Sequence, residues 1–80
     1  MKKKELEKLA DAIVAMTYQF TNVYCEDNKV KEIDKQLWAA LHVGFFAGAK
    51  YSGIDEEDIS QALEIARIKI SVLEGLKKNP

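Results

Sequence analysis

The chain has 80 residues, of which 12 are Lys or Arg and 13 are Asp or Glu, and its formal net charge is -1. This balance supplies no overall positive charge that would attract nucleic acid or an anionic membrane surface. A chain of this length forms one small domain that buries only about 60% of its unfolded surface. The single cysteine, Cys25, excludes an intramolecular disulfide, so self-association is the expected source of further burial.

The uncharged stretches are too short to span a membrane. Residues 12–25 and 36–49 are the two main ones, each 14 residues long, whereas a spanning helix needs about 20 apolar residues. Charged residues also interrupt the first apolar segment, which argues against a secretory signal. With one unpaired cysteine, we expect a protein of the reducing cytoplasm that does not enter a membrane.

Residues 3–25 are expected to form the first helix. Apolar side chains recur there at alternating spacings of three and four residues, at Leu6, Leu9, Ile13, Met16, Phe20 and Val23. This spacing places them on one helical face. The following turn is predicted at residues 26–29, where Asp27 or Asn28 can cap the next helix.

The second predicted helix, residues 29–52, contains the run QLWAALHVGFFAGA, which is apolar on nearly every side. A helix of this kind must be covered on every side, so we expect a central, packed helix. One of its rows is small, with Ala40, Gly44 and Gly48 at four-residue spacing. Such a row allows another helix backbone to approach closely.

The second turn has a clear signature. Gly53 can adopt the left-handed conformation that ends a helix, and Asp55 can cap the third helix, predicted at residues 56–76. Glu56, Glu57 and Asp58 then place negative charge at the positive end of the helix dipole. This helix carries two apolar faces, one more than a small monomer needs.

The predicted fold is therefore all-α, a single domain of residues 1–80 with three antiparallel helices, completed by oligomerisation. A helical hairpin that dimerises is the alternative architecture. The residues expected in helix packing or at an oligomer interface are Trp38, Ala40, Leu41, Gly44, Phe45, Gly48, Ile65, Ile68 and Val72.

No catalytic, metal or cofactor site is expected. His42, the only histidine, shares a helical row with Trp38 and Phe46, which favours a structural role. Cys25 and His42 lie on different predicted helices, about 18 Å apart along the axis, too far for a nucleophile and base pair. The acidic residues lack the spacing of a calcium loop or another metal motif.

The segment FFAGAKYSGIDEEDISQAL resembles a helix-turn-helix, because Ala49, Gly53 and Ile59 have the spacing of its small, turn and core residues. Its recognition helix would open with acidic residues that DNA phosphates repel, which disfavours nucleic-acid binding. The same turn resembles that of all-α nucleotide pyrophosphatases of the MazG type. Leu37 and Ala40 stand where that family has carboxylates that hold magnesium, so the resemblance implies a helical shape without the metal site.

The leading functional prediction is a non-enzymatic homo-oligomer, with a dimer favoured, that acts by binding a partner protein, like many small bacterial and phage regulators or inhibitors. The acidic residues Asp55, Glu56, Glu57 and Asp58 are a candidate patch for that partner. The alternative is a homo-oligomer that binds a small ligand or nucleotide in a pocket between subunits. The groups expected to line this pocket are Tyr18, Asn22, Tyr24, His42 and Tyr51, with Thr17, Thr21 and Trp38 as further candidates. A DNA-binding protein ranks third.

Overall fold

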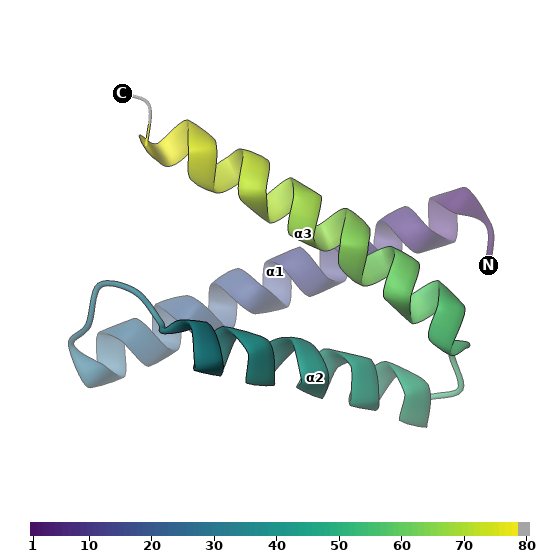
Figure 1. The fold of residues 1–80 in the computed structure, drawn as a ribbon, viewed down its shortest axis with the longest axis horizontal. Coiled ribbons are helices and arrows are strands. Elements are labelled where there is room, and N and C mark those ends of the chain that lie inside the picture. The colour runs from purple at the N-terminus through teal and green to yellow at the C-terminus, as the bar shows by residue number, and fades with distance from the viewer. Residues whose placement is uncertain (79–80) are drawn as a thin grey trace.

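The computed structural model describes residues 1–78, which form three helices: α1 (Lys3–Asn28), α2 (Lys35–Tyr51) and α3 (Glu56–Lys78) (Figure 1). Consecutive helices run in opposite directions, so the predicted all-α, three-helix arrangement is confirmed. Residues 79–80 of the predicted domain lie outside the described residues.

The core lies where α3 crosses α1 (Figure 1). Ala10, Ala62 and Ala66 are at most 1% exposed and Ile13 is 3% exposed. Three of these four residues are alanines, whose small side chains let the two helix backbones approach closely at the crossing. Larger, partly buried side chains surround them, namely Leu6, Leu9, Val14, Phe45, Leu63 and Ile65.

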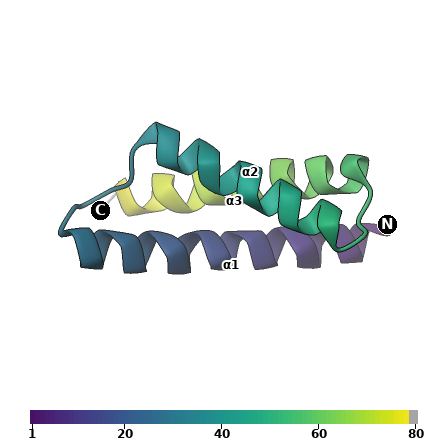
Figure 2. The same cartoon turned by 90° about the horizontal axis from the view of Figure 1, so that it is seen from below.

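The second helix lies at the edge of the protomer. It packs on α3 and only slightly on α1, and its start is separated from α1 when the molecule is viewed from below (Figure 2). None of its residues is buried. The prediction of a central, packed helix is therefore wrong for the protomer. The molecule is flat, with extents of 37 × 27 × 17 Å, and its shortest dimension is less than two helix diameters.

The first turn lies later in the chain than predicted. The first helix continues to Asn28 and ends with Lys29 in the left-handed conformation, at φ 55°. Val30 N donates to Cys25 O at 3.1 Å, which satisfies one of the last carbonyls. Asp34 caps α2, because its Oδ1 accepts a 2.8 Å hydrogen bond from Leu37 N. The prediction that Asp27 or Asn28 caps the second helix is thus wrong.

The second turn follows the prediction at Gly53. Gly53 has φ 99°, and its N–H donates to Lys50 O at 3.0 Å, while Ile54 N donates to Ala49 O at 3.2 Å. These two bonds form the Schellman motif that closes many helices. Asp55 O accepts from Ile59 N at 3.0 Å and so begins the hydrogen bonding of α3. That helix continues through Gly75 and ends at Lys78, two residues beyond the predicted end at residue 76.

The two turns allow a matched test, because both left-handed positions end a helix but only Gly53 is a glycine. Gly53→Ala is expected to reduce the free energy of unfolding by about 1–2 kcal/mol. Lys29→Gly is expected to raise it by up to about 1 kcal/mol, because glycine adopts this conformation without steric cost. Urea unfolding followed by circular dichroism measures both changes. Equal and small effects of the two substitutions would contradict this interpretation.

Candidate functional site

A shallow apolar groove separates α1 from α2. It consists of two adjoining depressions of about 330 and 630 Å³ that share Phe20, Leu41 and Phe45. Phe20 is 38% exposed. The groove exists because α2 packs on α3 and leaves its other side uncovered. Its apolar lining comprises Met16, Phe20 and Val23 from α1 and Leu37, Ala40, Leu41, Gly44 and Phe45 from α2.

Two small residues of α2, Ala40 and Gly44, line this groove, and Gly48 lies one turn further along the same helical row. Ala40, Gly44 and Gly48 are all exposed. A Cβ added at Gly44 or at Gly48 would meet no neighbouring atom within 4 Å. The close helix contact that this row predicts is therefore not made within the protomer.

The other predicted interface residues divide between the core and the surface. Trp38 is partly buried, and Phe45 and Ile65 pack against the core cluster. Ile68 and Val72 are 57% and 58% exposed, on a stripe of α3 that no other helix covers. The protomer thus exposes two separate apolar surfaces, the groove and this stripe of α3.

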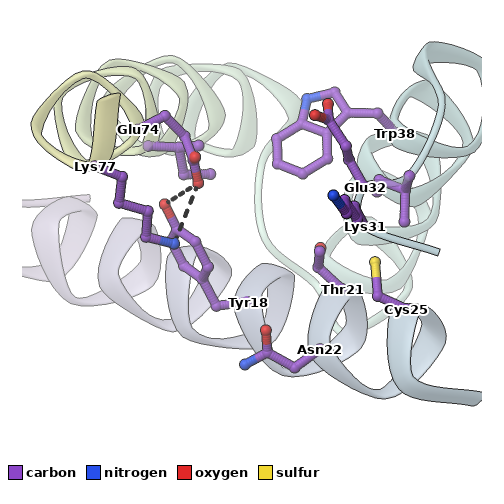
Figure 3. A pocket seen from close by; sticks show the side chains of 11 residues that line it. Tyr18, Thr21, Asn22, Cys25, Lys31, Glu32, Trp38, Glu74 and Lys77 are labelled. Atoms are coloured by element: carbon purple, nitrogen blue, oxygen red, sulfur yellow. Dashed lines mark hydrogen bonds and ion pairs between the residues drawn. The ribbon is translucent and has the colours of Figure 1, made fainter. Parts of the chain in front are cut away.

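A second, more polar cleft of about 500 Å³ lies between α1, the C-terminal half of α3 and the loop before α2 (Figure 3). It contains two of the five predicted pocket residues, Tyr18 and Asn22, whereas Tyr24 and Tyr51 do not line it. Tyr51 is 95% exposed, and the Tyr24 ring stacks on Phe20 with centroids 6.0 Å apart. Two further candidates, Thr21 and Trp38, also line the cleft. The sequence prediction omits the rest of the lining, which is Cys25, Lys31, Glu32, Ile33, Ile70, Glu74 and Lys77.

Polar groups lie at one end of this cleft, opposite the Trp38 ring (Figure 3). Tyr18 Oη donates to Glu74 Oε1 at 2.8 Å. Lys77 Nζ lies 3.6 Å from the same carboxylate and 4.6 Å from the centre of the Tyr18 ring. Near the middle, Thr21 Oγ1 is buried without a hydrogen-bond partner among the described residues. An unpaired buried hydroxyl can accept or donate to a bound molecule.

Burial, and then the hydrogen bond to Glu74 and its negative charge, raise the pKa of Tyr18 to about 12 from the ordinary value of 10.0. The neutral phenol is therefore favoured by the folded state. Its stabilising contribution is complete below pH 10.0 and is lost as the pH rises through about 12. The difference in absorbance at 295 nm between wild type and Tyr18→Phe should show one phenol with a midpoint near pH 12. A midpoint at the ordinary value would show that the Glu74 contact does not form.

His42 does not line the cleft. The centre of its ring lies 5.1 Å from that of the Trp38 ring, which does line it. Its Nε2 is buried and lacks a partner among residues 1–78. Burial, followed by the positive charge of Arg67, lowers the pKa of His42 from 6.5. This position suits the predicted structural role, because a neutral imidazole is favoured there.

The lowered pKa of His42 predicts a loss of stability in acid. The unfolded chain binds the proton more tightly, so the stabilising contribution is present above pH 6.5 and falls as the pH decreases toward the folded-state pKa. An NMR titration of the imidazole should give a midpoint below 6.5 in the folded protein. In His42→Gln, this part of the pH dependence of unfolding should disappear. A midpoint above 6.5 would contradict the proposed burial.

Two of the four acidic residues at the start of α3 form ion pairs within the chain. Asp58 Oδ2 lies 3.4 Å from the Met1 backbone nitrogen, and Glu56 forms an ion pair with Lys50. Asp55 and Glu57 are exposed. Glu56 is exposed as well, so three of the four acidic side chains face solvent as a small patch.

Residues 1–78 contain no group of three or more His, Cys, Asp or Glu side chains placed to hold a metal ion. Within the same residues, none of the helices is both long and apolar enough to cross a membrane. Comparisons of the chain with protein-family models, curated proteins and solved structures find no match.

Proposed function

We propose that this protein is a non-enzymatic homo-oligomer, in its simplest form a dimer, that acts by binding a partner protein. The observation that carries the proposal is that α2, an almost entirely apolar helix, contains no buried residue. An exposed apolar surface of this extent is typical of protein interaction sites. The cytoplasm suits such a protein, because its single cysteine needs no oxidising compartment.

The small size of the core supports the same proposal. Six hydrophobic residues are buried, and three of them are alanines. By contrast, eleven large hydrophobic side chains are exposed, including Val43 at 68% and Leu76 at 66%. Hydrophobic burial contributes roughly 25 cal/mol per Å², so covering part of this surface would add substantially to a marginal domain.

Sedimentation velocity and thermal unfolding over protein concentrations from about 1 to about 500 μM test the self-association. We expect a monomer–dimer equilibrium and a Tm that rises with concentration, because association stabilises the folded state by mass action. A monodisperse monomer with a constant Tm across this range would overturn the proposal.

Two surfaces remain for the partner once the groove is covered: the stripe of α3 that contains Ile68 and Val72, and the acidic patch. A photo-crosslinking residue at Val72 or at Glu57 would distinguish them in an extract of cells that produce the protein. We expect a defined adduct from Val72, since the stripe is the larger exposed apolar surface. Ser71, an exposed neighbour, is the matched control position. An adduct from Glu57 alone would assign the partner to the acidic patch.

The second candidate function is small-molecule binding in the cleft. The unpaired hydroxyl of Thr21, in the cleft that the Trp38 and Tyr18 rings also line, favours it. Ligand pockets typically combine aromatic walls with a few polar groups. A thermal-shift screen with nucleotides and metabolites should then find one compound class that raises the Tm of wild type but not of Trp38→Ala. Equal shifts in the two proteins would place binding elsewhere.

A further inference from the structure

The total exposed surface of the chain is larger than that of a compact monomer of the same mass. The chain exposes 6200 Å², whereas a compact monomer of 9.0 kDa exposes about 4,900 Å². The surplus of about 1,300 Å² exceeds the roughly 800 Å² that each partner contributes to a standard stable interface. The surplus, which is taken over the whole chain, is therefore as large as one standard interface requires.

The uncovered edge of α2 is also self-complementary. Positions four and seven residues before and after Gly44 lie on the same helical face as Gly44. Along this face a large side chain stands at each end and three small residues stand between them. The five residues are Leu37, Ala40, Gly44, Gly48 and Tyr51. The two glycines have open space around them, and Tyr51 is 95% exposed. A two-fold axis at Gly44 would therefore place the small residues of this face opposite the small residues of a second copy.

We infer that α2 pairs with α2 of a second copy, in an antiparallel orientation, about a two-fold axis at Gly44. The inference rests on the proposed self-association and specifies its geometry. In this arrangement Ala40 lies opposite Gly48 of the second copy, so the backbones approach where both sides are small. Leu37 lies opposite Tyr51 of the second copy, whose ring covers the end of the groove beside Phe20.

The antiparallel orientation is favoured by charge as well as by shape. Two adjacent parallel helices place their dipoles side by side with like ends together, whereas antiparallel helices pair opposite ends. A parallel pair would also place the two Tyr51 rings together at one end and the two Leu37 side chains at the other. The antiparallel pair instead places one large aromatic side chain at each end of the contact.

Cysteine cross-linking in a Cys25→Ser background tests this geometry. A disulfide forms only where two Cα atoms come within about 7 Å, and the open space at the glycines accommodates the new side chains. Gly44→Cys should cross-link to itself. Ala40→Cys and Gly48→Cys should each remain monomeric when oxidised alone and form a disulfide dimer when mixed.

Ser71→Cys, exposed on α3, is the control and should not cross-link above the background level. Self-linking of both Ala40→Cys and Gly48→Cys, without enrichment in the mixture, would indicate a parallel pair and overturn the inference. Absence of all cross-links in a protein that sediments as a dimer would place the interface elsewhere and leave the proposed function intact. A protein that sediments only as a monomer would overturn both.

Discussion

Replacement of Gly44 by leucine is expected to dissociate the oligomer while the three-helix protomer stays folded. In the protomer nothing lies within 4 Å of a Cβ at this position, so the new side chain extends into solvent. Leucine also has a higher helix propensity than glycine, by about 0.8 kcal/mol. Folding of the protomer should therefore be unchanged or slightly favoured.

The interface should respond in the opposite way. Two leucines inserted at a symmetric close contact overpack it at a cost of about 2–6 kcal/mol in total. This cost corresponds to a dissociation constant raised at least about 30-fold. Sedimentation velocity measures the change, and circular dichroism verifies that the helix content is retained.

Ala39→Leu is the matched control for this substitution. Ala39 is also exposed on α2, but the helical period places it on a face that points away from Gly44. It should leave the dissociation constant within a few-fold of the wild-type value. An unchanged dissociation constant in Gly44→Leu would show that this face of α2 is not the interface.

The sequence predicted the helices well because local chemistry determines them. Gly53 ends α2 with two characteristic hydrogen bonds, and only a glycine avoids strain there. The other turn was misplaced because Asp27 and Asn28 are also good capping residues, although they belong to the last turn of α1. The position of Asp34, directly before the apolar run, was the better signal for a helix start.

The cleft could not be predicted in full, because it depends on how the helices cross. Tyr18 and Glu74 are 56 positions apart in the sequence and meet only through the packing of α1 on α3. The crossing depends in turn on Ala10, Ala62 and Ala66. The helical period places these alanines on apolar faces, but it does not determine which positions of two faces meet or at what angle. Thr21 could be recognised as a polar residue on an apolar face, but not as one without a hydrogen-bond partner.

The sequence correctly identified α2 as an apolar helix but predicted its position in the fold wrongly. The apolar character of residues 36–49 indicated burial, and the protomer leaves the helix at its edge. The hydrophobic effect favours states in which an apolar surface is covered. It does not determine whether the same chain or a second chain covers that surface. The same pattern therefore supports an interface as readily as a core.

Replacement of Ile59 by alanine is expected to have the largest effect on folding of the protomer. Ile59 is 0% exposed and is one of the two largest fully buried side chains. Loss of three buried carbon atoms leaves a cavity, and such substitutions cost about 2–5 kcal/mol. A domain of this size has a total stability of only about 4–12 kcal/mol. At the midpoint of that cost, the Tm should fall by roughly 15–25 °C.

The comparison requires a monomer, because the proposed self-association would make the Tm dependent on concentration. We therefore expect the measurement to be cleanest in the Gly44→Leu background, with Ile68→Ala on the same helix as control. Ile68 is 57% exposed, so its loss should cost less than about 1 kcal/mol. Equal losses at the two positions would show that the face of α3 that contains Ile59 does not form part of the core of the monomer. A much larger loss at Ile59 would show that burial of this face of α3 holds the monomer together without a second copy.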